Sequence, residues 1–264
     1  AANDLNFTFV VESEQSDRLV RQLHEQVILQ SADQDSFGPT LPQLMGEDEE
    51  EEANGDSWWK DKREELLDIA DKSGSSYVYD LDTIEHHANL ISNLDAVSRS
   101  LYAIKANANT KVLKKFRSLG FGFECVSIGE VQKIFKLFPD IDPTNILFTP
   151  NFAPREEYEQ GLELGVNVTL DNIYPLKEWP EVFEGHQVFL RIDPGHGHGH
   201  HKHVKTGGVH SKFGMPRFQI PEVAELVDAL DITVKGLHAH IGSGINDPQS
   251  CKATAVKLHK VANE

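Results

Sequence analysis

Short runs of apolar and β-branched residues alternate with segments of helical periodicity along the chain from about residue 57 onward. Runs of this length between turn-forming residues are typical of buried strands. They predict strands at residues 77–79, 101–104, 123–126, 145–148, 166–170, 188–192 and 234–241. The connections are short, so each helix returns the chain to the same end of the sheet, and we expect parallel strands.

Apolar residues between these runs recur every three or four positions, which predicts helices packed against the sheet. The faces that this spacing gives are Ile84, Ala88 and Ile91; Val112, Leu113, Phe116 and Leu119; and Val131, Ile134, Phe135 and Phe138. Asp82 with Glu85 resembles a capping box that begins the first helix. Gly120 is expected to end the second, and Pro154 and Pro221 lie where later helices begin.

About six β-α units follow one another without a break. The sequence therefore predicts an α/β fold: a (β/α)8 TIM barrel truncated after about six units. A doubly wound sheet is less favoured, because its first strand normally leads into a GxGxxG turn, which is absent there.

The first 56 residues differ from this pattern. Residues 1–30 predict one strand at 7–11 and one amphipathic helix at 16–28, which cannot bury a core alone, so we expect the remnant of another domain and a longer natural protein. Residues 31–56 predict a disordered linker with the acidic run EDEEEE at 47–52, for which a metal or basic-partner site is the alternative. Residues 57–264 are expected to form the incomplete barrel.

Composition narrows the classes of partner. The formal charge of -17, from 42 Asp and Glu against 25 Lys and Arg, argues against nucleic acid or an anionic membrane surface. No stretch approaches the roughly 20 apolar residues of a membrane span. The only cysteines, Cys125 and Cys251, cannot form a disulfide framework, so we expect a cytoplasmic protein.

Polar residues end the predicted strands, where a TIM barrel has its active site. In chain order they are Lys105; Glu124 and Ser127; Asn151; Asp171 and Asn172; Arg191 and Asp193; and His238 and His240, followed by Gly242, Ser243 and Gly244. Polar and ionisable groups thus gather at one predicted rim, in contrast to the apolar strand bodies.

Lys105 is the sharpest of these candidates. A lysine in an apolar strand either extends its ammonium to water or an ion pair, or serves as a desolvated amine nucleophile that forms a Schiff base. The glycine-rich turn at residues 240–244 leads into a helix expected near Pro248, and its N–H groups with the Ser243 hydroxyl suit a phosphate. His240 belongs either to this rim or to the core.

Residues 196–214 are rich in glycine and histidine. A metal site at His196, His198, His200, His201 and His203 is one interpretation. No cysteine or carboxylate is interleaved, and the glycines leave the segment unfixed, so a mobile active-site loop is favoured. Cys125 is most simply a buried strand residue.

These motifs as a set resemble the fold-type III pyridoxal phosphate (PLP) enzymes, the alanine-racemase-like barrels. The segments YVYDLDTI, LYAIKAN, GFGFECVSIGE, ILFTPN, FLRIDPG, SKFGM and GLHAHIGSG occur in the order and spacing of diaminopimelate decarboxylases, from about residue 75 to the end.

The resemblance implies a role for each matching residue. Lys105 would hold PLP as a Schiff base, His240 would stack on the pyridine ring, and Ser243 would bind the phosphate. Arg191 would lie near the phenolic oxygen and Glu124 near the Lys105 amine. The implied catalytic and cofactor-binding residues are Lys105, Glu124, Arg191, His240, Gly242 and Ser243.

The implied reaction is PLP-dependent decarboxylation of meso-2,6-diaminopimelate to L-lysine and CO2, by a protein that is a homodimer when full length. Residues 1–28 resemble the C-terminal end of an aspartokinase regulatory (ACT) domain, which implies a bifunctional aspartokinase/diaminopimelate decarboxylase. The second phosphate loop, the carboxylate that pairs with the pyridinium nitrogen and a C-terminal β domain are expected beyond residue 264. The alternatives are a decarboxylase of ornithine, arginine or carboxynorspermidine, and a non-catalytic PLP-barrel regulatory protein.

We predict that the histidines at 196–203 hold no structural metal, because the glycines between them do not fix a coordination geometry. Elemental analysis of protein purified without a metal-affinity column should find less than stoichiometric zinc or nickel. Stoichiometric metal that disappears in His200→Ala would contradict this.

Overall fold

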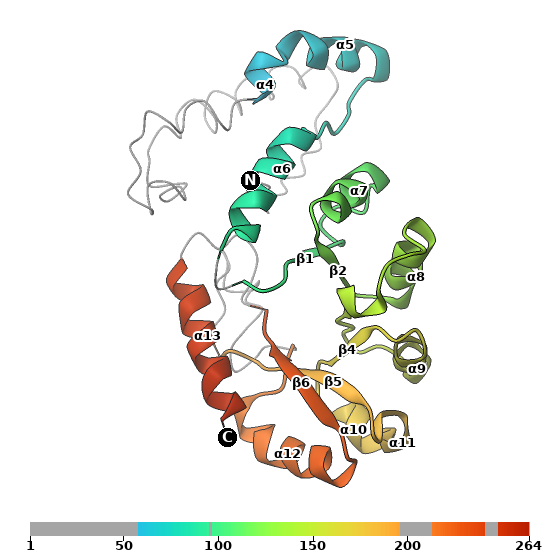
Figure 1. The fold of residues 1–264 in the computed structure, drawn as a ribbon, viewed down its shortest axis with the longest axis vertical. Helices are drawn as coiled ribbons and strands as arrows, with labels where there is room; N and C mark the ends of the chain where they lie inside the picture. Colours follow the sequence, from blue (N-terminus) through green and yellow to red (C-terminus); the bar gives the residue numbers. More distant parts are fainter. Residues whose placement is uncertain (1–57, 95–96, 196–212, 241–247, 264) are drawn as a thin grey trace, which may run out of the picture.

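The computed structural model describes residues 58–94, 97–195, 213–240 and 248–263 (Figure 1). The predicted ACT-like remnant at 1–30 and the acidic linker at 31–56 lie outside the described residues, as do the histidines at 196–203. What the sequence predicts for these three segments is therefore untested by the structure.

The centre of the fold is a sheet of parallel strands in chain order. The strands are β1 (Leu101–Ala103), β2 (Gly122–Cys125), β3 (Ile146–Phe148), β4 (Asn167–Leu170), β5 (Gln187–Arg191) and β6 (Thr233–His238). Each strand pairs with the next one along the chain, from β1 to β6. A doubly wound sheet reverses its order part-way, and this sheet does not. The predicted α/β class and the parallel direction are confirmed.

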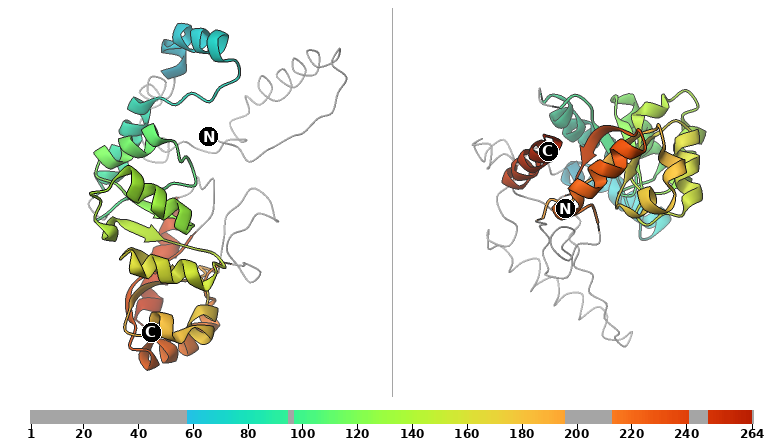
Figure 2. Two further views of the ribbon diagram at one scale, coloured as in Figure 1. Left: turned by 90° about the vertical axis from the view of Figure 1, so that its right-hand side faces the viewer. Right: turned by 90° about the horizontal axis from the view of Figure 1, so that it is seen from below.

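Helices connect the strands and lie along the sheet (Figures 1 and 2). They are α6 (Leu81–Ser92), α7 (Thr110–Ser118), α8 (Ile128–Leu137), α9 (Arg155–Glu163), α10 (Tyr174–Glu178), α11 (Pro180–Phe183), α12 (Ile220–Ala229) and α13 (Pro248–Ala262), with short 3-10 turns at Pro143–Asn145 and Arg217–Gln219. Gly120 follows α7 at a φ of 83°, and Pro154 and Pro221 lie at helix starts, as predicted. Helices α7, α8 and α12 bury apolar residues of their inner faces, whereas α6 buries only Ala88 and leaves Ile91 48% exposed.

The core lies between the strands and these helices. Phe123, Ile146 and Phe148 from the strands are fully buried, as are Leu113 from α7 and Ile134 from α8. Helix α9 packs tightly on the sheet at the buried Gly161, where an added Cβ would lie 3.0 Å from Phe148 and 3.2 Å from Val168. The positions of the strand ends are fixed by this packing.

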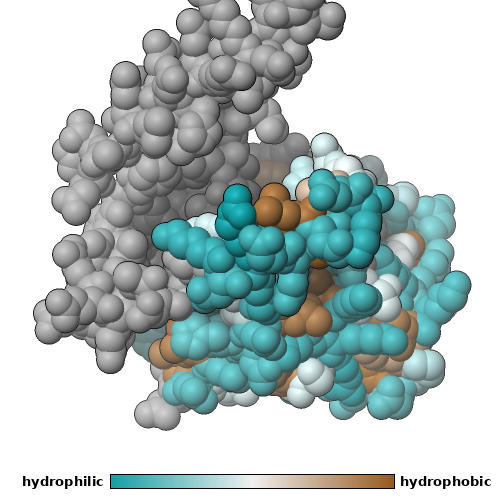
Figure 3. All heavy atoms as spheres, turned by 90° about the horizontal axis from the view of Figure 1, so that it is seen from above, coloured by the Kyte–Doolittle hydropathy of each residue, from teal (hydrophilic) through white to brown (hydrophobic). Residues whose placement is uncertain are grey.

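Two helices precede α6 and the sheet: α4 (Trp58–Asp61) and α5 (Arg63–Ser73). Neither helix contains a buried residue. Where Figure 3 colours the surface seen from above, hydrophilic residues predominate and hydrophobic groups are scattered among them. Among the described residues, no helix is both long and apolar enough to cross a membrane.

Two local predictions are wrong. Residues 77–79 form no strand: they pair with no strand among the described residues, and Tyr77 is 93% exposed. The pattern was strand-like, but a strand also needs a neighbour for its backbone groups. The cap of α6 is Asp80, not Asp82. Asp80 accepts hydrogen bonds from the Thr83 backbone N–H at 2.9 Å and from Lys62 Nζ at 2.6 Å.

We predict that substitution by alanine destabilises the protein at Gly122 but not at Gly129. In Gly122→Ala the new methyl would overlap the Asn145 carbonyl and the Leu101 side chain, so overpacking should cost about 2 kcal/mol or more. Gly129→Ala on α8, where an added Cβ would meet only Ser127 Oγ at an ordinary contact distance of 3.9 Å, should be neutral or stabilise by up to about 1 kcal/mol. Urea unfolding of both variants tests this, and equal midpoints would refute the packing of β2 described here.

Candidate active site

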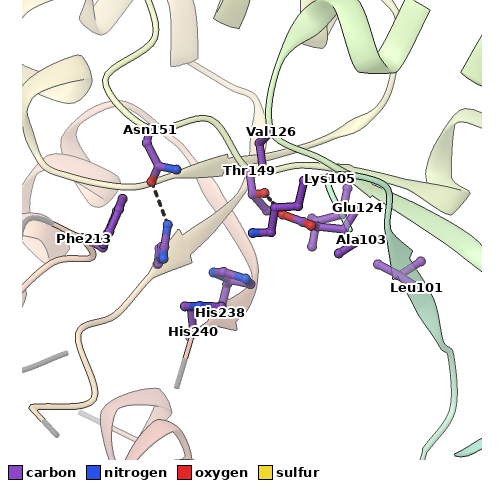
Figure 4. A pocket seen from close by; sticks show the side chains of 12 residues that line it. Leu101, Ala103, Lys105, Glu124, Val126, Thr149, Asn151, Phe213, His238 and His240 are labelled. Atoms are coloured by element: carbon purple, nitrogen blue, oxygen red, sulfur yellow. Dashed lines mark hydrogen bonds between the residues drawn. The ribbon is translucent and has the colours of Figure 1, made fainter. Parts of the chain in front are cut away.

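A cavity of about 370 Å³ opens where the strands end (Figure 4). Its size lies within the range of small-molecule sites. The polar side chains that line it are Lys105, Glu124, Thr149, Asn151, Arg191, His238 and His240. Five of the strands contribute to this set, since parallel strands bring their ends to one edge.

Lys105 lies in the turn that follows β1. The buried Ile104 beside it donates its N–H to the Glu124 carbonyl at 3.1 Å, which extends the sheet by one residue and directs Lys105 to the rim. We predicted that Lys105 ends the first strand and lies at the rim. The structure places it two residues past β1, exposed at the cavity, where the chain turns between Ala103 and Ala106.

Glu124 and Thr149 form a hydrogen-bonded pair on neighbouring strands. The Thr149 hydroxyl donates to a Glu124 carboxylate oxygen, and the Thr149 N–H donates to the Cys125 carbonyl at 2.8 Å. Figure 4 places this pair and Lys105 on the same side of the cavity. Thr149 was missed by the sequence analysis. Its place directly after β3 was the signal that could have found it.

Arg191 ends β5 and is almost fully buried, with 7% of its surface exposed. Its Nη1 donates to Asp171 Oδ1 at 2.9 Å and to Asn151 Oδ1 at 2.7 Å. Its guanidinium carbon lies 4.9 Å from the centre of the Phe213 ring, a cation-π contact. Burial raises the pKa of Asp171, and the charge of Arg191 opposes that rise.

His238 and His240 lie two residues apart at the end of β6 and share one side of the cavity (Figure 4). Burial lowers the pKa of His238 to about 3, and the charges of Arg191, His240 and Lys105 add to this effect. Burial, then Lys105 and Arg191, lower the pKa of His240. Both rings are therefore neutral at pH 7. Within the described part of the chain, Nδ1 of His238 is enclosed without a hydrogen-bond partner.

Three of the predicted rim residues serve local turns instead. Ser127 caps α8 by accepting from the Glu130 N–H, Asn172 accepts from the Tyr174 N–H, and Asp193 accepts from the Gly195 N–H. None of them lines the cavity. Gly242, Ser243 and Gly244 lie outside the described residues, so the predicted phosphate turn stays a prediction.

Comparison with known proteins places this cavity in context. Residues 81–264 match the pyridoxal-dependent decarboxylase family, pyridoxal binding domain. The chain belongs to this family. As a member of the pyridoxal-dependent decarboxylases it takes pyridoxal phosphate as its cofactor, as the resemblance implied.

Relatives in the same family include several diaminopimelate decarboxylases. The diaminopimelate decarboxylase of Methanothermobacter thermautotrophicus is 34% identical over 205 residues, which are 75% of this chain and 47% of that protein. The Escherichia coli K12 enzyme is 31% identical over 172 residues, 64% of this chain and 40% of that protein. The chain thus spans about half the length, or less, of these curated relatives.

Solved structures give the same fold. Diaminopimelate decarboxylase from Helicobacter pylori complexed with L-lysine has a TM-score of 0.64 at 28% identity, over 76% of this chain and 52% of that one. The arginine decarboxylase of Paramecium bursaria Chlorella virus has a TM-score of 0.64 at 22% identity, over 75% and 53%. The second likeness concerns the fold alone.

The cavity fits the cofactor of this decarboxylase family. Lys105 supplies an amine for the aldehyde of pyridoxal, and Arg191 supplies donors for an anionic oxygen. Neutral imidazole rings beside them can pack against an aromatic ring, and the unpartnered His238 Nδ1 calls for a polar group within the cavity. Cys125 is fully buried on β2, and burial raises the pKa of its thiol, so this cysteine is not an accessible nucleophile at the rim. Among the described residues there is no group of histidines, cysteines and carboxylates suited to a metal.

The lowered pKa of His238 predicts a specific pH dependence of stability. A neutral buried histidine stabilises the fold above its unfolded pKa of about 6.5, and this contribution is lost as pH falls from there toward 3, because the unfolded chain then binds the proton first. At pH 5 the loss is about 2 kcal/mol. Urea unfolding at pH 7 and pH 5 should show a smaller pH effect in His238→Gln than in the wild type. The exposed His186→Gln is the control. An unchanged pH effect in His238→Gln would refute the assignment.

Proposed function

We propose that the complete protein decarboxylates meso-2,6-diaminopimelate to L-lysine and CO2 with pyridoxal phosphate. One observation carries the proposal: Lys105, Arg191 and His240 meet in one cavity of a chain that is 34% identical to a diaminopimelate decarboxylase. The likeness to a relative whose solved complex contains L-lysine supports the same product.

In this mechanism the bound cofactor withdraws electrons from the bond that breaks at the substrate α-carbon. Lys105 binds the cofactor through Nζ, and the neutral His240 ring packs against it. Arg191 donates hydrogen bonds from a fixed position. Glu124 accepts a hydrogen bond from the Thr149 hydroxyl, and its carboxylate lies on the same side of the cavity as Lys105. From there it can hold or accept a proton. In the overall reaction a C–C bond breaks, CO2 leaves, and the α-carbon takes a proton.

The wider architecture is part of the proposal. The β1–β6 sheet would be part of an eight-stranded barrel, since its order is sequential and parallel throughout. The first 30 residues would belong to an ACT-like domain in a protein fused to aspartokinase, and the enzyme would be a cytoplasmic homodimer. Gly242 and Ser243 would bind the cofactor phosphate.

A decarboxylase of ornithine or arginine is the rival within the same fold. The likeness to the viral arginine decarboxylase, at 22% identity, gives this rival less support than the 31–34% identity to diaminopimelate decarboxylases gives the proposal. A non-catalytic role has less support still, because the cavity retains an amine, an arginine and two histidines.

We predict that borohydride reduction of the full-length protein with pyridoxal phosphate labels Lys105. Peptide mapping should find the label there, and Lys105→Ala should abolish it and lower kcat by about a thousandfold or more, a barrier increase of about 4 kcal/mol. Lys114→Ala, on the exposed side of α7, is the matched control. Label on another lysine in the wild type would overturn the role of Lys105.

We also predict that CO2 release by the full-length protein is at least about a hundredfold faster, by kcat/KM, with meso-diaminopimelate than with ornithine or arginine. That ratio corresponds to about 3 kcal/mol of discrimination. A preference for ornithine or arginine would support the rival. Pyridoxal binding without any decarboxylation would support the non-catalytic role.

A further inference from the structure

Asp171 lies directly behind the cavity without lining it. It follows β4, and Arg191 ends the adjacent β5, so the register of the two strands sets the side chains next to each other. Asp171 is fully buried, and its Oδ1 accepts from Arg191 Nη1 at 2.9 Å. Burying a carboxylate is costly unless an ion pair and hydrogen bonds offset the lost hydration, and Arg191 and the Gly214 N–H supply these to Asp171.

The hydrogen bonds to Arg191 are concentrated on one nitrogen. Asp171 and Asn151 both accept from Nη1, at 2.9 and 2.7 Å. Phe213 packs against the guanidinium, with its ring centre 4.9 Å from the guanidinium carbon. In the described part of the chain, the remaining Arg191 donors have no acceptor on a protein side chain. The guanidinium is therefore held at Nη1 and on one face, and Arg191 lines the cavity.

The same carboxylate oxygen also holds the chain that carries Phe213. Gly214 donates its N–H to Asp171 Oδ1 at 3.3 Å. Its φ of 79° suits glycine, and an added Cβ would meet the Asp193 backbone nitrogen at 2.8 Å. The next residue, Met215, donates its N–H to the Arg191 carbonyl at 2.7 Å. Asp171 thus joins the arginine to the segment that covers it.

We infer that Asp171 is a positioning residue for cofactor binding, which acts through Arg191 by holding Nη1 so that the other guanidinium donors face the bound pyridoxal phosphate. The inference rests on the cofactor of the proposed function and not on which amino acid is decarboxylated. The competing explanation is that the buried pair contributes only to folding.

A double-mutant cycle on cofactor affinity separates the two explanations. The variants are Asp171→Asn, Arg191→Gln and the double variant, made in the full-length protein. Asn at 171 keeps an oxygen that can accept from Gly214, so it removes mainly the charge that holds Arg191. Asp142→Asn, at the opposite end of the sheet, is the matched control. The Kd for pyridoxal phosphate is measured by absorbance titration without substrate, together with near-ultraviolet circular dichroism of the bound cofactor and urea unfolding of the apoprotein.

We expect Asp171→Asn to weaken pyridoxal phosphate binding about tenfold and to change the dichroism of the bound cofactor. In the Arg191→Gln background the same substitution should change Kd by no more than about twofold. Two results would overturn the inference: a lower stability of apo Asp171→Asn with unchanged Kd and dichroism, or a tenfold effect of Asp171→Asn that persists in the Arg191→Gln background.

The cycle still gives an answer if Asp171→Asn alone does not fold. The double variant leaves no unpaired buried charge, so comparison of Arg191→Gln with the double variant still decides the question. Equal Kd values support action through Arg191, and a further tenfold loss contradicts it. Because no substrate is present, a wrong assignment of the amino-acid substrate would leave these results unchanged.

Discussion

Parallel strands in chain order impose the constraint on which the rest of this structure depends. Each strand from β2 to β6 pairs with its predecessor in the same direction, so the residues that follow the strands lie along one rim. Lys105, Glu124, Arg191 and His240 are far apart in sequence, yet they line one cavity because each comes at or just past a strand end. The buried side chains between sheet and helices hold this rim in place, and the chemistry depends on that packing.

The groups at the rim also determine one another's charge. Burial, with the charges of Arg191 and Lys105, lowers the pKa of both histidines, so both rings are neutral beside these basic side chains. Glu124 and Asp171 supply negative charge from the neighbouring strands, each tied by a hydrogen bond to Thr149 or Arg191. A change in any one of these groups alters the field at the others, because charges interact more strongly in a poorly solvated cavity than in water.

Much of this could be predicted from the sequence, because strand position follows from apolar runs and the rim follows from strand direction. The limits are specific. Residues 77–79 have a strand pattern, but no local pattern reveals whether a partner strand lies alongside. Asp171 was identified as a strand end, but its pairing with Arg191 depends on register between strands, which single runs do not encode. Phe213 lies 22 residues after Arg191, and only folding brings it onto the guanidinium.

The overall charge of -17 would repel an anionic cofactor at long range, and the geometry of the cavity resolves this conflict. Carboxylates such as Glu64, Glu156 and Glu184 lie on exposed positions, where salt screens them beyond about 8 Å. Arg191 is enclosed at the rim and little screened, with Lys105 nearby in the same cavity. The local field in the cavity therefore depends on the few charges that line it, and Asp171 offsets part of the Arg191 charge while it holds the guanidinium. An acidic protein can bind a phosphate-bearing cofactor because binding responds to the field within the cavity and not to the net charge of the chain.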